Sequence, residues 1–264
     1  MISLFVAFFQ VLLWGFSTGN NFYEAFLPEV SNQISVREST IDLQIRVDHK
    51  IFVFGKESGN LEKVKVGMDV LPFVQIPGIE GYEIDFHRLS WKRTKEGQIQ
   101  IRGKYGPKAI EVIWTIFPDG KLKMETSKLP QAMSDLLGFG FDLDQSQLLQ
   151  ASWENAHFEP ESVVFDAQTA LHPVEIGKLN SMQLDFAEVK VGIKTETVGT
   201  KVLLKFPDSS IEGPLDPDLR FLFPSNTSLI SSNDHISPGQ SSTLIGEEEA
   251  LASSKIILWF DFHQ

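Results

Sequence analysis

The amino-acid sequence predicts an all-β fold, a large antiparallel β-sandwich, on three observations. Apolar and polar residues alternate in many short segments, which is the period-2 pattern of half-buried strands. Turn-forming residues separate these segments, most clearly Pro118-Asp119-Gly120. The 21 Phe and 5 Trp, against 3 Tyr, provide large aromatic side chains that suit strands better than helices. A chain of 264 residues, 42% of them hydrophobic, can bury a sizeable core.

The first strand is expected where the alternation begins, in Ile41-Asp-Leu-Gln-Ile-Arg-Val47. Strand-turn-strand patterns predict two hairpins, Lys50–Phe54 with Leu61–Val66 and Ile110–Phe117 with Lys121–Glu125. Further strands are expected at Gln98–Arg102, Gly138–Leu143, Glu188–Ile193, Val202–Phe206 and Lys255–Phe260. This regular spacing of strands and turns is typical of a sandwich or a barrel.

Helical periodicity does not persist long enough to predict a long helix. Two short helices are candidates, at Gln131–Leu137 and Glu247–Ala252. Between Pro207 and Gly246 the chain is rich in Ser, Pro, Asn, Asp and Gly, so we expect mostly long loops there.

The chain is expected to divide into an N-terminal segment with a linker, residues 1–40, and a β-sandwich domain, residues 41–264. The stretch Ile2–Phe16 is apolar but shorter than the ~20 residues of a membrane-spanning helix, so no membrane span is expected. It fits either a signal peptide or a remnant strand of a longer protein. If residues 1–19 are a signal peptide, the protein is extracytoplasmic; otherwise the sequence leaves its location open.

The charge distribution argues against nucleic acid as a partner. The formal net charge is −12, and the densest basic run is the short segment Trp91-Lys92-Arg93-Thr94-Lys95. The chain has no cysteine, which excludes thiolate nucleophiles and Cys-ligated zinc. No metal-binding, phosphate-binding or nucleophile-elbow motif is present, so we expect neither a metal nor another cofactor.

Several segments, taken in order, are similar to a known family. They are Ile110–Glu125, Leu137–Asp144 and Leu148–Trp153, with Phe52–Leu61 as an opening strand-turn-strand and Lys255–Phe262 as a closing strand. Together they resemble the C-terminal domain of family-2 glycoside hydrolases of the β-galactosidase type. The resemblance covers most of the chain from Leu43 onward. It implies a large antiparallel "supersandwich" similar to galactose mutarotase, and a role associated with carbohydrate.

Two departures from this family shape the functional prediction. The family's catalytic glutamates lie on a separate (β/α)₈ barrel, and no alternating strand-helix pattern here would build one. After Trp153 the family continues with glycines and a proline beside the sugar, whereas this chain reads Trp153-Glu-Asn-Ala-His-Phe-Glu-Pro160. We therefore expect a domain without catalytic residues of its own, which binds a galactoside or glucoside. If the chain is part of a longer enzyme, that enzyme is expected to be a glycoside hydrolase with a catalytic barrel.

Candidate catalytic groups can be named only by residue type, because a sequence does not show the distance between two carboxyl groups. Asp142 and Asp144 share a strand face, as a carboxylate pair would, but such residues are more often a solvent face. The run Glu247–Glu249 is interpreted as a solvated charge run. Mutarotase-type chemistry needs a histidine acid and a carboxylate base, and His157 and His172 lie in expected loops. Surface or capping roles suit both histidines better.

Sugar binding needs an aromatic platform with polar groups beside it. Trp153 followed by Glu154, Asn155 and His157 is the one local cluster that offers both, and it is the predicted carbohydrate site. The alternative is that Trp153 is the last core residue of its strand. The other tryptophans in alternating strands, Trp91, Trp114 and Trp259, are expected in the core.

Three functions remain open on the sequence. The first is a non-catalytic domain associated with carbohydrate. The second is an enzyme similar to aldose-1-epimerase on the same fold, and the third is a purely structural or interaction module.

Overall fold

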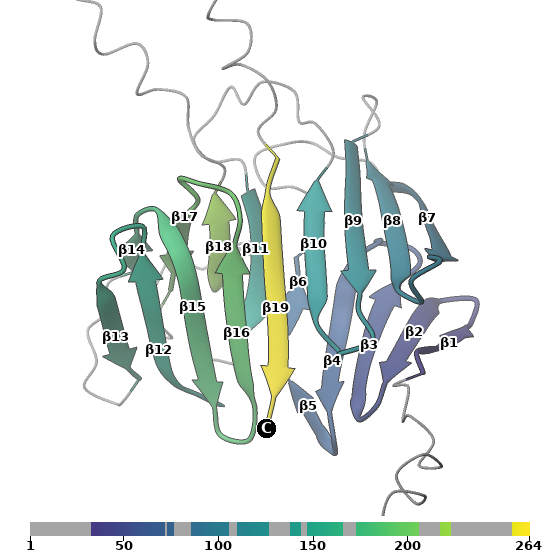
Figure 1. Ribbon diagram of the computed structural model, residues 1–264, viewed down its shortest axis with the longest axis horizontal. Coiled ribbons are helices and arrows are strands. Elements are labelled where there is room, and N and C mark those ends of the chain that lie inside the picture. Colours follow the sequence, from purple (N-terminus) through teal and green to yellow (C-terminus); the bar gives the residue numbers. More distant parts are fainter. Residues whose placement is uncertain are drawn as a thin grey trace, which may run out of the picture. The chain divides into compact units, whose positions relative to one another are not determined.

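Antiparallel strands in three sheets make up the part of the chain that the computed structural model describes (Figure 1). The described residues are 33–71, 73–76, 86–105, 110–126, 138–143, 147–165, 173–205, 217–222 and 255–264. They form nineteen strands and no α-helix. The predicted all-β sandwich is therefore confirmed.

The largest of the three sheets has nine strands, and its neighbours are joined by antiparallel pairing throughout. In spatial order they are β13 (Pro160–Val164), β12 (Leu148–Asn155), β15 (Leu179–Phe186), β16 (Lys190–Thr195), β19 (Ile257–His263), β10 (Leu122–Thr126), β9 (Ile110–Ile116), β8 (Ile99–Tyr105) and β7 (Phe86–Arg93).

Two five-stranded sheets complete the sandwich. The first contains β1 (Ser35–Glu38), β2 (Asp42–Val47), β3 (Lys50–Gly55), β4 (Leu61–Val66) and β5 (Asp69–Leu71). The second contains, in spatial order, β14 (Val174–Ile176), β17 (Lys201–Leu204), β18 (Leu219–Leu222), β11 (Gly138–Leu143) and β6 (Phe73–Gln75).

Both smaller sheets pack on the same face of the nine-stranded sheet through aromatic side chains. Phe54 of the first small sheet meets Trp114 of β9 edge-on at 5.8 Å between ring centroids. Phe73 and Phe141 of the second small sheet lie 5.7 and 5.5 Å from Phe260 of β19. Because inward side chains alternate with outward ones, the opposite face of the nine-stranded sheet carries polar side chains.

The two predicted hairpins are confirmed, because β3 pairs with β4 and β9 with β10. The second hairpin turns at Gly120, whose φ of 78° lies in the left-handed region that glycine adopts at no steric cost. The first described strand, β1, starts at Ser35, before the expected strand at Ile41. Alternation does not predict this strand, because the strand has only four residues and only its Val36 side chain packs against the core.

A strand also lies where mostly loops were expected. β18 falls between Pro207 and Gly246, and it pairs with both β11 and β17. It has four residues, of which Leu219 and Phe221 are buried and Arg220 is partly exposed. Four residues flanked by turn-forming sequence give too short an alternation to predict a strand.

Two of the three tryptophans expected in the core are elsewhere. Trp114 is buried, as predicted. Trp91 shares the inner face with its register partner Ile101, but it is 37% exposed because β7 is the edge strand of the sheet. Trp259 is half-buried on the outer face, since its neighbours Leu258 and Phe260 take the inner face of β19. The prediction is therefore wrong for Trp91 and Trp259, because alternation shows which residues share a face but not how much of that face is covered.

Some expectations lie outside the described residues. They concern residues 1–32, with the signal peptide or remnant strand, and the two short helices at 131–137 and 247–252. Within the part of the chain that the structure describes, no helix has the length and apolarity to span a membrane.

Phe141 joins the two layers at the centre of the core, so we expect Phe141→Ala to lower the free energy of unfolding by about 3–5 kcal/mol. The side chain is fully buried and stacks on Phe73 at 4.6 Å as well as contacting Phe260. Urea denaturation followed by tryptophan fluorescence measures the change. Met68→Ala is the control, because Met68 is 84% exposed and should change stability by less than about 0.5 kcal/mol. Similar losses in both variants would contradict this packing.

Candidate functional site

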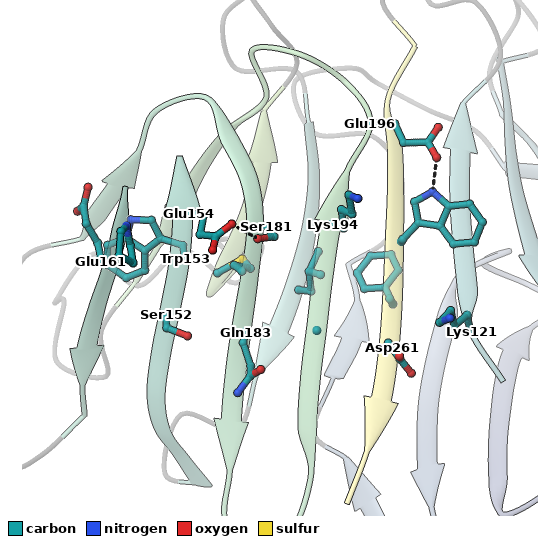
Figure 2. Close-up of a pocket in the computed structure, with 16 residues that line it drawn as sticks. Lys121, Ser152, Trp153, Glu154, Glu161, Ser181, Gln183, Lys194, Glu196 and Asp261 are labelled. Carbon is teal, nitrogen blue, oxygen red and sulfur yellow. Dashed lines mark hydrogen bonds between the residues drawn. The ribbon is translucent and has the colours of Figure 1, made fainter. Parts of the chain in front are cut away.

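The outer face of the nine-stranded sheet carries a groove of about 710 Å³ (Figure 2). It lies over β12, β15, β16 and β19, with β13 and β10 at its sides. Backbone and inward-facing residues form its floor, and side chains that alternate with them point outward. These outward groups are Ser152, Glu154, Ser181, Gln183, Lys194, Trp259 and Asp261.

The groove is hollow at Gly192, because glycine has no side chain to fill the space. Gly192 lies in register between Gln183 and Asp261, in the middle of three neighbouring strands. A Cβ added there would lie no closer than 3.8 Å to its neighbours, which is an ordinary contact, and its φ is not in the left-handed region. Neither sterics nor backbone geometry therefore requires glycine. A glycine within a strand costs stability and often marks a place where another group approaches the backbone closely.

Trp259 stands beside this hollow as a fixed aromatic platform. Its indole Nε1 donates a hydrogen bond to Glu196 Oε1 at 2.7 Å, as Figure 2 shows. The ring of Phe117 lies 5.0 Å away, and the Lys123 ammonium lies 5.3 Å from the indole centroid. These contacts hold the ring in one orientation without burying it completely.

A row of polar side chains crosses the groove at the level of Trp259. Glu154, Ser181, Lys194 and Trp259 are direct neighbours on four successive strands. Ser181 Oγ donates to Glu154 Oε2 at 3.4 Å. The row therefore offers a carboxylate, a hydroxyl, an ammonium and an indole along one line.

Asp261, at the other side of Gly192, is held by a lysine from the opposite layer. Lys50 Nζ of β3 lies 3.3 Å from Asp261 Oδ1 and donates to the Gly120 carbonyl at 3.4 Å. The Lys50 side chain is only 9% exposed, whereas that of Asp261 is 43% exposed. A Cβ at Gly120 would lie 3.0 Å from Lys50 Cδ, so the glycine of the β9–β10 turn leaves room for this lysine. The ion pair fixes Asp261 while leaving it accessible from the groove.

The four residues of the predicted carbohydrate site occupy three different environments. Trp153 lies on the groove floor but is only 7% exposed, and its strand neighbour is the buried Met182. Glu154 points into the groove. Asn155 and His157 do not line it: the Asn155 side chain accepts hydrogen bonds from the backbone N–H of His157 and Glu159 and so shapes the β12–β13 turn. His157 is exposed in that turn.

The other candidate groups do not gather at the groove either. Asp142 lies on β11 in the opposite layer, exposed on the face away from the core. Partial burial, followed by the nearby carboxylate of Asp218, raises the pKa of Asp142, while Lys205 opposes the shift. Asp144, His172 and Glu247–Glu249 lie outside the described residues.

Sequence reasoning missed the residues that dominate the groove, above all Trp259, Asp261 and Gly192. One signal could have found the first two: alternation in Ile257–His263 places Trp259 and Asp261 together on the face opposite Leu258 and Phe260. An aromatic and a carboxylate on one strand face satisfy the requirement that singled out Trp153. Gly192 gave no signal, because its role depends on neighbours from other strands.

The groove can hold an uncharged polyhydroxyl ligand by stacking and hydrogen bonding. Its indole offers an apolar face, and amide, hydroxyl and carboxylate groups surround the hollow. Among the described residues, no group of three or more His, Asp or Glu side chains could hold a metal ion. No histidine is among the described residues that line the groove.

Comparison with known proteins gives matches to 45 chains of solved structures, including the following two. No family model matches the sequence, and no curated protein matches it. The structure of HI1317 is similar with 7% identity over 90% of this chain and 98% of that chain, at a TM-score of 0.41. A "putative mutarotase (YeaD)" from Salmonella typhimurium is similar with 9% identity over 89% of this chain and 95% of that chain, at a TM-score of 0.42. The fold class follows from the strand pairing itself, independently of these two similarities.

Because Trp153 is buried, Trp153→Ala is expected to lower the free energy of unfolding by about 3–5 kcal/mol. Thermal and urea denaturation measure the loss. Val198→Ala is the control, since Val198 is 88% exposed. A loss in Trp153→Ala as small as that in the control would show that the indole is a surface group.

Ionisation of Asp142 is expected to oppose folding, since its pKa is higher in the folded chain than in the unfolded chain. The penalty is present above the folded-state pKa and absent below the unfolded-state pKa. Asp142→Asn should therefore raise the melting temperature slightly at about pH 7 and leave it unchanged at about pH 3. The effect is small because the side chain is exposed. Glu57→Gln, at an exposed carboxyl in the β3–β4 turn, controls for the loss of one negative charge, and an equal pH-dependent gain there would contradict the prediction.

Proposed function

We propose that this protein binds carbohydrate in the groove of the nine-stranded sheet and does not itself cleave glycosidic bonds. In this proposal the chain is a non-catalytic domain related to the C-terminal domain of β-galactosidase-type glycoside hydrolases. The ligand is a galactoside or a glucoside. The ligand contacts in this proposal are Trp259, Gly192, Asp261 and Glu154, and Trp153 packs beneath the groove floor.

The observation that carries this proposal is the half-buried Trp259 fixed beside the hollow over Gly192. A pyranose has an apolar face that stacks on an indole and hydroxyls around its edge that need polar partners. Here Asp261, Gln183 and Glu154 surround the space next to the indole. Because Glu196 and Lys50 hold Trp259 and Asp261 in place, little side-chain entropy is lost on binding.

The contacts of the groove carboxylates favour binding over hydrolysis. Glu154 accepts a hydrogen bond from Ser181, Glu196 accepts one from Trp259, and Asp261 is paired with Lys50. A glycosidase needs one carboxyl as a proton donor and a second one on the opposite side of the scissile bond. Carboxylates engaged with neighbouring donors suit the recognition of hydroxyl groups better than this task.

An enzyme similar to aldose-1-epimerase remains the alternative of a different class. Such chemistry needs an acid and a base at the anomeric centre, for which histidine and a carboxylate are suited. The groove provides the carboxylates, but the described residues that line it include no histidine. A purely structural module is the third possibility, and the absence of any saccharide binding would favour it.

Trp259→Ala is expected to weaken binding of galactosides or glucosides at least tenfold, because the stacking platform is lost. Isothermal titration with methyl galactosides and glucosides, followed by short oligosaccharides, measures the effect. Trp259 is only half-buried, so a thermal melt should show a much smaller loss of stability than in Trp153→Ala. Unchanged affinity in Trp259→Ala would overturn the proposed site.

Gly192→Val is the matched variant that fills the hollow without removing any contact. Valine suits a strand better than glycine, and a Cβ at this position meets only ordinary contacts, so stability should be equal or higher. Saccharide binding should nevertheless be lost, because the added methyl groups occupy the ligand's space. A variant that is both more stable and still able to bind would contradict the role given to the groove.

The purified protein is expected to show no turnover of aryl β-galactosides or β-glucosides, and no acceleration of mutarotation of fresh α-D-galactose or α-D-glucose. Chromogenic assays and polarimetry test the two reactions. Hydrolysis that disappears in a single carboxylate variant such as Glu154→Gln would establish a glycosidase. Faster mutarotation that disappears in His157→Ala or His172→Ala would establish the epimerase instead.

A further inference from the structure

The far end of the same outer face is positively charged, although the protein as a whole is acidic. The edge strand β7 and its neighbour β8 contain no Asp or Glu. In a chain with 35 acidic and 23 basic residues, such a concentration of one sign is unusual. The Lys and Arg side chains of these strands are Arg88, Lys92, Arg93, Arg102 and Lys104.

Four side chains at this end form a square around a small pocket. Ser90 lies opposite Arg102, and Lys92 lies opposite Gln100, on the two adjacent strands. All four point to the outer face, because the alternating residues Ile99 and Ile101 are buried in the core. Together with Trp91, they line a pocket of about 190 Å³.

The two cations of this pocket have donors that the described protein does not use. The Nε atom of Arg102 is buried and has no hydrogen-bond partner. Its Nη1 lies 3.7 Å from Glu111 Oε2, beyond hydrogen-bond distance, while Lys104 lies 3.0 Å from the other oxygen of that carboxylate. No ion pair or hydrogen bond joins Lys92 to another described residue. A buried donor without a partner is costly, so Arg102 Nε favours an incoming acceptor, and the exposed ammonium of Lys92 is accessible to the same group.

Arg93, next to Lys92 in the basic run Trp91–Lys95, has a structural role. Its guanidinium donates to the Ile34 carbonyl at 2.7 Å and to the Gly97 carbonyl at 3.3 Å. It therefore fixes the start of the first small sheet and the β7–β8 turn. Lys92, on the other face of the strand, remains available for a ligand.

We propose that Arg102 and Lys92, with Gln100 and Ser90, bind the carboxylate or sulfate group of an acidic glycan. An arginine fork matches the planar or tetrahedral oxygens of such groups, and the ammonium, amide and hydroxyl provide further donors. The pocket volume is suited to one anionic substituent. This site is separate from the groove and would bind its anion even if the groove bound no sugar.

The position of the site favours a glycan over other anions. Trp259, Lys123, Thr115, Gln100 and Lys92 are successive neighbours across five strands. At 4.7–4.9 Å per strand, this polar row spans about 19 Å from the groove to the cationic pocket. An oligosaccharide that lies across the strands could stack on Trp259 and place a charged substituent beside Arg102. A single small anion would use only the pocket.

The test compares three oligosaccharides of similar length by isothermal titration: a neutral galactose oligomer, a galacturonate oligomer and a sulfated galactose oligomer. We expect at least one of the two anionic oligomers to bind at least tenfold more tightly than the neutral one. Lys92→Gln and Arg102→Gln should each remove most of this advantage and leave the affinity for the neutral oligomer unchanged. Which oligomer binds more tightly distinguishes a carboxylate from a sulfate ligand.

Lys63→Gln is the matched control, since it removes one positive charge from an exposed position on β4 in the opposite layer. It should leave all three affinities unchanged, and thermal melts verify that each variant folds. The inference is wrong if the anionic oligomers bind no more tightly than the neutral one, or if Lys63→Gln weakens them equally. It is also wrong if single-stranded DNA binds through Lys92 and Arg102 more tightly than either glycan. If anionic oligomers bind through these residues while the neutral one does not bind, this inference stands and the proposed groove function fails.

Discussion

The packing of Phe260 between the two layers is the contact on which both the core and the groove depend. Its ring meets Phe73, Phe141 and Trp114 at 5.5–5.8 Å, and thus touches both the second small sheet and the neighbouring part of its own sheet. Because β19 is regular, burying Phe260 forces Trp259 and Asp261 onto the opposite face. The core contact and the orientation of the groove residues are therefore consequences of the same register.

This register is set by contacts between residues far apart in the sequence. β19 is inserted between β10 and β16, and about half the chain separates it from the hairpin that contains β10. Lys50, from the other layer, closes the arrangement through Asp261. Pairings of this kind are costly in chain entropy, and sheet proteins with high contact order fold slowly for this reason. The groove is therefore complete only when the last strand is in place.

This dependence on distant contacts explains how far the sequence alone could predict the protein. The hairpins at Lys50–Val66 and Ile110–Glu125 were predictable because turn residues and alternation are adjacent in the chain. Trp259 was wrongly predicted to lie in the core. Alternation shows which residues share a face, but whether that face is buried depends on strands elsewhere in the chain. Trp153 was a reasonable aromatic candidate for the same reason, and its burial follows from the row of core residues on neighbouring strands.

A cluster of two lysines and one carboxylate lies on the outer face between the groove and the cationic pocket. Between the groove and the cationic pocket, Glu125 lies 2.8 Å from Lys123 and 3.1 Å from Lys255. Partial burial alone would raise the pKa of Glu125, but hydrogen bonds from the two lysines outweigh it and lower that pKa. The carboxylate therefore stays ionised at neutral pH and balances one of the two lysine charges.

This cluster of Lys123, Glu125 and Lys255 lies between Trp259 and Arg102. In the two proposals, Trp259 and Arg102 contact different parts of one ligand. Lys123, which pairs with Glu125, also lies over the Trp259 ring, so its ammonium group interacts with both the carboxylate and the indole. Arg102 is paired with Glu111 at 3.7 Å, and Lys104 shares that carboxylate, so one negative charge faces two cations. A ligand lying along this row would therefore meet an aromatic surface first and an excess of positive charge near the sheet edge. In the two proposals, the sugar ring would therefore be bound at the central strand β19 and its charged substituent at the β7 edge of the same sheet.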